Sequence, residues 1–426
     1  MMERHKILVR IAARNVRRQA RRSLLTASAM VLGIALLMLV RALEAGGHKA
    51  LVESAVRLGT GHIAIEHPEY AASRDLVHRI PAQQLQLAKE EVAAAAGRGE
   101  VRVVFPRLTV GGLAQSPSSA IPVQIAGVEP AREAPVSLLA ESTVKGRFLE
   151  PGDRLEAVVG RGLAERLRVE LGSRLVLMAE GVHGELESQL VFVTGIFQTG
   201  IPEVDRGTVQ LPLETAREWL GVGGDATSLN VILTSERWAG PVARAVGEGL
   251  ESSVGAGEVA VKPWWEALPD LHAGLQADAV QTYVMFLILL AIVALAVVNS
   301  VLMAVLYRTR EFGVVRSLGL NRRSVGGMVM VEGTLLTMVS GVGGMLLGLV
   351  LAQGVFRNGI DISRILSEED LAFGGAVIDP VVLPVVQSGD VVAILAIVMA
   401  IGILASLYPA WQATRIEPAE AMKVED

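Results

Sequence analysis

The side chains best suited to binding a metal ion are His62, Glu66 and His67, which lie close together in the chain. Imidazole and carboxylate groups are common ligands of zinc and similar ions. These residues fall in a short β-type run, and on a strand His62 and Glu66 share one face while His67 points to the other. The spacing therefore argues against a metal site, and we expect this chain to bind no metal.

Sequence motifs of catalysis are otherwise missing. There is no G-x-S-x-G, no H-E-x-x-H and no convincing pair of acidic residues. The absence of cysteine excludes disulfides, thiolate metal sites and a cysteine nucleophile. There is also no G-x-x-x-x-G-K-[ST] loop to cradle nucleotide phosphates. We therefore expect a chain that is not an enzyme and binds no cofactor of its own, so that any ATP hydrolysis belongs to another polypeptide.

The composition is that of a membrane protein. Of 426 residues, 51% are hydrophobic and only 19% are charged, and the mean hydropathy is +0.45. Soluble proteins of this length are rarely so apolar. The net charge of −5 gives no reason to expect a nucleic acid as a partner.

Four apolar runs approach or exceed the roughly 20 residues that a helix needs to cross a bilayer. The first and last runs qualify narrowly. We expect the membrane spans at residues 23–45, 282–307, 325–356 and 391–409.

The distribution of charge around these runs fixes the expected orientation. Lys and Arg are concentrated before the first span and between the second and third, whereas acidic residues dominate between the third and fourth. Because basic segments stay on the cytoplasmic side, residues 308–324 and the tail 410–426 are expected in the cytoplasm together with the N-terminus. Residues 46–281 and 357–390 are then extracytoplasmic.

The first 22 residues allow two interpretations. Ile7, Leu8, Ile11 and Val16 fall roughly on one helical face among basic residues, which suits an amphipathic helix at the cytoplasmic interface. Alternatively, the basic residues serve only as a topology signal. A cleaved signal peptide is disfavoured because no A-x-A site follows the first span.

The long segment 46–281 has the pattern of an α+β domain, expected to form two subdomains. Residues 264–282 are expected to continue as helix into the second span. The expected strands lie at residues 62–67, 101–106, 121–128, 157–160, 174–179, 190–197 and 207–213, and the expected helices at 81–97, 161–170, 213–221 and 236–251.

Segments along the whole chain resemble the FtsX/MacB-like permease superfamily, the type VII ABC transporters, including its start, which is similar to the entry helix and first span of that superfamily. The segment 299–325 is similar to its R-x-x-E-[FI]-G-x-x-[RK]-[AS]-x-G signature, and residues 61–70 and 192–221 are similar to its lipoprotein-releasing LolC/LolE branch. The end of the chain resembles its terminal motif through Pro409, Ala410, Ala413, Pro418 and Ala421.

The resemblance implies a four-helix membrane protein whose large α+β extracytoplasmic domain is of the MacB periplasmic core type. It implies a bacterial inner-membrane complex in which a second permease copy, or a homologous permease, pairs with this one on a dimer of ABC ATPase subunits. ATP and Mg would bind to those ATPases. Their hydrolysis would drive movement outside the membrane, a mode of action called mechanotransmission, with a lipoprotein or other lipid-linked substrate taken from membrane lipid.

The segment between the second and third spans is the expected contact with the ATPase. Residues 309–318 are compatible with a helix whose Phe312, Val315 and Leu318 lie near one face, which suits docking into a groove. The alternative is a basic loop that only fixes topology. The resemblance assigns ATPase coupling to Arg308, Arg310, Glu311, Phe312, Gly313, Val315, Arg316, Leu318, Gly319, Arg322 and Arg323.

Within the spans, Ser340, Gly344 and Gly348 have the four-residue spacing of small side chains that lets helices approach closely. This contact could lie within one chain or between two permeases. Glu332 is a membrane carboxylate, expected to be an interfacial residue near the docking segment, and Asn299 could hydrogen-bond to a neighbouring helix.

The function expected first is extraction of lipoproteins from the outer leaflet of the inner membrane. One alternative is a MacB-like efflux permease that works with an adaptor and an outer-membrane channel. Another is an FtsX-like regulator of cell-wall hydrolases, although the outer domain of this chain is large for that role. A membrane-tethered enzyme is the least favoured reading, for want of catalytic residues.

Overall fold

The computed structural model describes residues 20–96, 100–255, 257–361, 372–373, 376–377 and 381–416. The proposed interfacial helix at residues 1–22 therefore lies almost wholly outside the described residues. The chain divides into two compact units. We call residues 1–48, 277–361 and 381–426 the membrane unit, and residues 49–276 and 362–380 the α+β unit.

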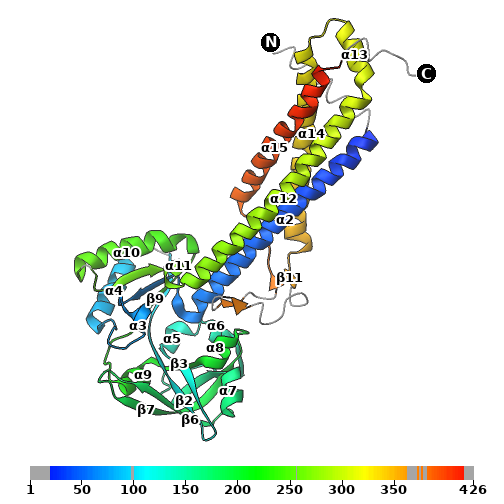
Figure 1. Cartoon of the computed structure of the whole chain (residues 1–426). Helices are drawn as coiled ribbons and strands as arrows, with labels where there is room; N and C mark the ends of the chain where they lie inside the picture. The colour runs from blue at the N-terminus through cyan, green and yellow to red at the C-terminus, as the bar shows by residue number, and fades with distance from the viewer. Residues whose placement is uncertain are drawn as a thin grey trace. The chain divides into compact units, whose positions relative to one another are not determined.

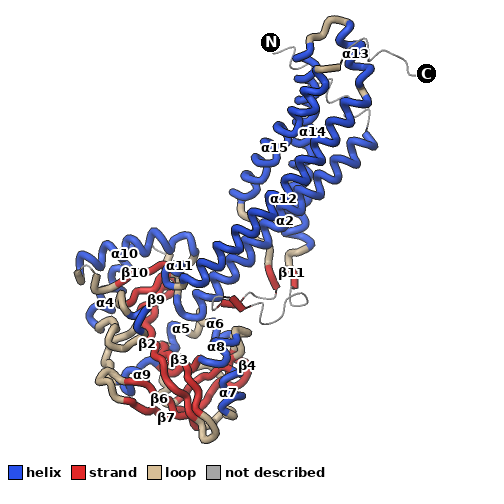
Figure 2. The backbone as a smooth tube through the Cα atoms, viewed as in Figure 1, coloured by secondary structure: helices blue, strands red, loops and turns tan. Residues whose placement is uncertain are grey.

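Four long helices form the spans (Figures 1 and 2). All four are long and apolar enough to cross a membrane, as the sequence predicted. They are α2 (Ala20–Ala55), α12 (Pro269–Tyr307), α14 (Arg322–Val350) with the π-helical turn η3 (Leu351–Val355), and α15 (Ser388–Thr414).

The helices are longer than the apolar runs within them. α2 continues to Ala55, beyond the expected end of the first span at 45. α12 begins at Pro269, within the segment 264–282 that was expected to continue as helix into the second span. Hydropathy locates where a helix leaves the bilayer, whereas a helix continues as long as its backbone remains hydrogen-bonded and its side chains find packing partners. Residues of α2 and α12 therefore belong to both units.

The connection from α12 to α14 is a short helix, α13 (Thr309–Ser317). It ends before Gly319, whose φ of +99° favours glycine. Asn321 then caps α14, because its side chain accepts a hydrogen bond from the backbone N–H of Ser324 at 2.7 Å. Arg322 and Arg323, which precede the expected third span, thus form the first turn of α14.

Small residues let α14 pack closely on α15. A Cβ added to Gly333 would overlap the side chain of Ser406, and one added to Gly402 would overlap Thr337. Buried apolar side chains complete the contacts of the membrane unit in two clusters. One contains Phe312 and Val329, and the other contains Ile34 and Val398.

The α+β unit is built on ten strands among the described residues. The strands are β1 (Ile63–Glu66), β2 (Val101–Gln115), β3 (Ala120–Val128), β4 (Thr143–Gly146), β5 (Glu156–Gly160), β6 (Arg174–Glu180), β7 (Leu186–Phe197), β8 (Thr208–Pro212), β9 (Ser228–Leu233) and β10 (Ala260–Pro263). β4, β9 and β10 were not expected from the sequence.

The first subdomain, which we call the sheet subdomain, has strand order β10-β1-β9-β2 and uses the first half of β2. Its core contains Ile63, Val231 and Leu250, and includes side chains of α4 and α10. The associated helical segments are η1 (Val56–Thr60), α3 (Tyr70–Ser73), α4 (Ala82–Ala95), η2 (Glu236–Trp238), α10 (Ala239–Ser253) and α11 (Trp264–Ala267).

The second subdomain, the barrel subdomain, uses the second half of β2. Its strands pair in the closed circuit β2-β3-β8-β5-β7-β6-β2, with β4 added beside β7. Leu108, Leu175 and Val209 lie in its core. Its helices are α5 (Pro130–Glu133), α6 (Leu138–Glu141), α7 (Arg161–Leu167), α8 (Pro202–Gly207) and α9 (Leu213–Leu220).

Short strands are also present in the segment between α14 and α15. In the membrane unit β11 (Ile360–Asp361) pairs with β14 (Val381–Val382). In the α+β unit β12 (Ala372–Phe373) pairs with β13 (Ala376–Val377).

Candidate functional site

The segment expected to contact an ATPase is organised around Arg308, which is buried at the end of α12. Its Nη1 donates to Glu332 Oε2 of α14 at 2.9 Å, and its Nε donates to Glu311 Oε2 of α13 at 2.8 Å. The guanidinium also lies over the ring of Phe312, 5.1 Å from its centroid. Arg308 therefore joins three helices and is not a free docking residue.

The predicted apolar ridge of α13 is not one exposed surface. Phe312 and Gly313 are buried, and Phe312 packs with Val305, Val329 and Ala410. Leu318, in contrast, is 82% exposed. Phe312 therefore does not share an exposed face with Leu318, because three-residue spacing on one helix does not show which side the other helices cover. Its role in ATPase coupling stays a prediction.

Several other residues of the segment also reach the surface. Val315 and Arg316 are half-buried, and Arg316 donates to the backbone carbonyl of Ile416. Gly319 is exposed in the turn after α13. The exposed charged residues of the segment are Arg310, Glu311, Arg322 and Arg323.

The C-terminal motif packs against this same segment. Pro409, Ala410 and Ala413 are buried on α15. A Cβ on Gly326 of α14 would lie 3.3 Å from the carbonyl oxygen of Ala410. Small side chains in the motif thus allow α15 to lie close to α14 beneath Phe312. Pro418 and Ala421 lie outside the described residues.

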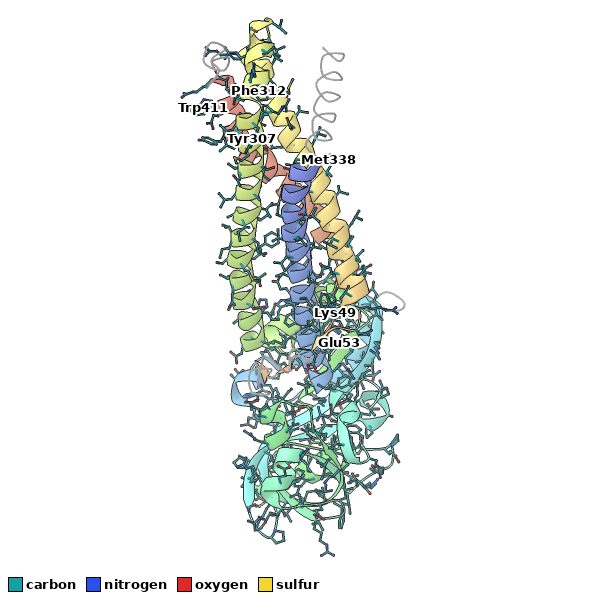
Figure 3. All side chains as sticks on the ribbon, turned by 90° about the vertical axis from the view of Figure 1, so that its right-hand side faces the viewer. Lys49, Glu53, Tyr307, Phe312, Met338 and Trp411 are labelled. Carbon is teal, nitrogen blue, oxygen red and sulfur yellow. The ribbon has the colours of Figure 1, made fainter. Side chains whose placement is uncertain are left out.

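An aromatic group near this end was not singled out from the sequence. Tyr307, Tyr408 and Trp411 are exposed, and the Arg415 guanidinium carbon lies 3.7 Å from the Trp411 ring centroid. Figure 3 shows Tyr307, Phe312 and Trp411 at the same end of the membrane unit. Tyr and Trp next to an apolar run are typical of a membrane interface, and that signal was available in the sequence.

The small residues of α14 contact α2 of the same chain. A Cβ on Gly344 would lie 2.6 Å from Ile34 Cβ, and one on Gly348 would lie 2.8 Å from Met38 Cβ. Ser340 is fully buried. Asn299 is on an exposed face of α12.

The three candidate metal ligands are engaged with other groups. His62 Nδ1 accepts a hydrogen bond from Leu233 N–H at 3.1 Å, and burial lowers the pKa of His62 to about 4. Glu66 pairs with Lys262 at 2.6 Å, and His67 stacks on His78. Within the described residues no three acidic or imidazole side chains are grouped to hold a metal ion.

The four spans and the large mixed domain define a multi-pass membrane protein with an extramembrane domain of the periplasmic core type. The model of the MacB-like periplasmic core domain matches residues 23–248, about half of the chain, and the model of the FtsX-like permease C-terminal region matches residues 283–418. The chain belongs to the family of FtsX/MacB-like ABC transporter permeases, which work with an ATPase.

Relatives with named functions fall in two groups. The chain is 27% identical to the lipoprotein-releasing system transmembrane protein LolC of Xylella fastidiosa, over 71% of this chain and 73% of that one. It is 23% identical to the lipoprotein-releasing system transmembrane protein LolE of Haemophilus influenzae, over 76% of this chain and 77% of that one. It is 22% identical to the macrolide export ATP-binding/permease protein MacB of Agrobacterium fabrum, over 94% of this chain and 58% of that one.

Proposed function

We propose that this chain is the permease subunit of an ATP-driven complex that extracts lipoproteins from the outer leaflet of the bacterial inner membrane for release. The similarity to LolC and LolE over most of both chains carries the proposal. In this complex the N- and C-termini are cytoplasmic and the α+β unit is periplasmic, as the basic residues at 308–323 favour.

The surface of α12 supports a lipid-linked substrate. Among the spans it has the smallest share of buried residues in its most apolar stretch. Its uncovered side chains recur every three or four residues, as one broad helical face requires. They include Val280, Tyr283, Val284, Met285, Leu287, Ile288, Ile292 and Leu295.

Such a face suits acyl chains or a second permease. Burial of an acyl chain contributes about 0.8 kcal/mol per methylene, so extraction of a long chain from the bilayer needs an energy source. ATP hydrolysis on a partner ATPase supplies it, and no ATP or Mg binds to this chain.

The proposed ATPase contact is the exposed part of the α13 region. Leu318 offers an apolar side chain, and Arg310, Arg322 and Arg323 add exposed positive charge in the same segment of the chain. Arg322 and Arg323 occupy the first turn of α14, where the helix dipole disfavours cations by about 0.3–1 kcal/mol each. An acidic partner surface would offset that cost. This surface rests on three buried residues, Phe312, Gly313 and Arg308.

A photocrosslinking residue at Tyr283 or Ile288 tests the substrate. With the ATPase and a second permease present, we expect crosslinks to lipoproteins that decrease when ATP is added. Leu404 is a matched control, because it is also exposed but lies on α15. Absence of lipoprotein crosslinks at both α12 positions, with none above the Leu404 background, would refute the proposal.

MacB-like efflux is the second candidate function. The MacB match covers 94% of this chain, more than either lipoprotein-system match reported above. A MacB-like permease would require an adaptor and an outer-membrane channel. Recovery of such an adaptor in crosslinks from the α+β unit, together with no lipoprotein at α12, would favour export.

A further inference from the structure

The end of α2 is an unusual piece of backbone. After Ala55 the helix passes into the π-helical turn η1, in which Gly59 has φ +124°. L side chains rarely adopt this φ. A Cβ on Gly59 would also overlap the guanidinium of Arg107. Glycine is therefore required at this position by conformation and by space.

Arg107 fills the space that Gly59 leaves. It lies on β2, where the strand passes from the sheet subdomain to the barrel subdomain, and its side chain is buried. Its Nη1 donates to the Leu58 carbonyl at 2.8 Å. The last carbonyls of a helix lack partners within the helix, and a cation there is favourable. Arg107 thus binds the end of α2 directly.

Glu133 holds Arg107 in this position. Arg107 Nε donates to Glu133 Oε2 at 3.1 Å, and Nη2 pairs with Oε1. Glu133 is 1% exposed. Because Glu133 ends α5, which follows the barrel strand β3 after a single residue, the ion pair connects the end of α2 to the barrel subdomain.

A second arginine strengthens the same connection from the helix side. Arg57 Nε donates to the Val136 carbonyl at 3.2 Å, and its guanidinium pairs with Glu141 of α6. Arg57 and Arg107 therefore hold one segment, residues 133–141, against η1 from two directions.

The turn η1 also lies between two apolar cores. Val56 belongs to the core of the sheet subdomain, together with Leu271 and Leu275 of α12. Leu58, two residues later, packs against a different cluster that contains Val128 and Leu139. Apolar packing thus attaches the sheet subdomain to both α2 and α12. At η1 the barrel subdomain is attached by Leu58 and the two arginines.

We propose that Arg107, Glu133 and the Leu58 carbonyl form a joint that fixes the barrel subdomain to the end of α2, so that a displacement of α2 reaches both subdomains together. The role of the joint in transport rests on the proposed function. The structural connection between α2 and the barrel subdomain is independent of that function and is tested separately.

Distances between spin labels test the joint in the full-length chain in lipid nanodiscs. The absence of cysteine allows a specific pair at Gln83→Cys on α4 and Ser188→Cys on β7, both exposed positions. The doubly labelled chain should give a narrow distance distribution. Glu133→Gln and Arg107→Lys, which weaken the bidentate pair, should broaden the distribution and shift its mean.

Glu129→Gln is the matched control. Glu129 pairs with Arg132 at 3.1 Å at the start of α5, but that pair is exposed. Its loss should leave the distribution unchanged. Equal distributions for the unsubstituted chain, Glu133→Gln and Arg107→Lys would overturn the joint. Where Glu133→Gln does not fold, the double variant Arg57→Gln/Glu141→Gln removes the more exposed half of the connection. It should broaden the distribution, and no change there would also overturn the joint.

The transport consequence has its own measurement. In the complex with the ATPase, Glu133→Gln should retain ATP hydrolysis and lose lipoprotein release. A broadened distance distribution with unimpaired lipoprotein release would show that the joint exists. It would also overturn the role of the joint in coupling ATP hydrolysis to release. If the unsubstituted complex releases no lipoprotein, the proposed function is wrong. The distance distributions between the spin labels still show whether the joint exists.

Discussion

Arg308 and Glu332 form an ion pair between α12 and α14, with Nη1 and Oε2 2.9 Å apart. Glu332 is a carboxylate in an otherwise apolar span, where an uncompensated charge is costly. Arg308 compensates that charge and also binds Glu311 of α13. The pair therefore fixes the start of α13 relative to α14 and supports the surface that we propose for the ATPase.

Replacing Arg308 with alanine should destabilise the membrane unit. The variant leaves Glu332 without its cation, and removal of one partner of a buried pair costs roughly 3 kcal/mol or more. Thermal unfolding of the purified chain in detergent measures this loss. Arg310→Ala is the control, because Arg310 is exposed two residues later. Equal unfolding temperatures for the two variants would contradict a structural role for the pair.

Substitutions of Leu318 and Phe312 should have different effects on ATPase binding and on stability. Leu318→Ser removes an apolar side chain that is exposed in this chain, so we expect weaker association with the ATPase and an unchanged unfolding temperature. Phe312→Ala creates a cavity among Val305, Val329 and Ala410 and should cost about 3–5 kcal/mol. Co-purification and thermal unfolding, measured on both variants, check the two effects. A Leu318→Ser variant that binds the ATPase normally would exclude Leu318 from the contact.

The helix of the coupling segment could be predicted from sequence, but its exposed face could not. The segment expected as helix, 309–318, is α13 at Thr309–Ser317. The buried position of Phe312 depends on side chains from α12, α14 and α15 that are far apart in the chain. Contacts between helices that are distant in sequence cannot be read from the spacing of Phe312, Val315 and Leu318.

The four spans were predictable for a different reason. A bilayer imposes a minimum apolar length on each helix, so the signal is local. The partner of Glu332 was less evident, although a membrane carboxylate calls for a cation and Arg308 stands at the end of the preceding span.

The strands that were missed form mostly long-range pairs. Ile63 of β1 lies between Val231 of β9 and Pro263 of β10, which are distant in sequence. Closure of the barrel likewise depends on the register of β2 with β6, where Leu113 lies opposite Met178, and register follows from the packed core rather than from any one segment.

Enlarging Gly348 should weaken the packing of α14 on α2. In Gly348→Val the new side chain would meet Met38 Cβ, which a Cβ alone would approach to 2.8 Å. We expect a lower unfolding temperature, because overpacking typically costs about 1–3 kcal/mol. Gly327→Ala on the same helix is the control, since its Cβ would meet no atom within 4 Å. It should be neutral or slightly stabilising. An unchanged unfolding temperature for Gly348→Val would show that α14 and α2 can move apart near Gly348 at little cost in stability.

His62 should make the α+β unit sensitive to mild acid. Burial lowers the pKa of His62 from 6.5 to about 4, so between these values the unfolded chain binds more protons than the folded chain. The stabilising contribution is then complete above about pH 6.5 and is lost as the pH falls towards 4. The free energy of unfolding should decrease by at most about 1.4 kcal/mol per pH unit from this group. Partial exposure of the ring makes the effect smaller.

His62→Asn isolates this contribution. Asparagine does not titrate, and its side-chain oxygen can accept the hydrogen bond that Leu233 N–H donates to His62 Nδ1 at 3.1 Å. Unfolding by urea, followed through tryptophan fluorescence between pH 7.5 and 4.5, should show a weaker pH dependence for this variant than for the unsubstituted chain. His183→Asn, at an exposed position, should retain the original pH dependence. Identical slopes for all three proteins would mean that His62 is protonated as easily in the folded chain as in the unfolded one.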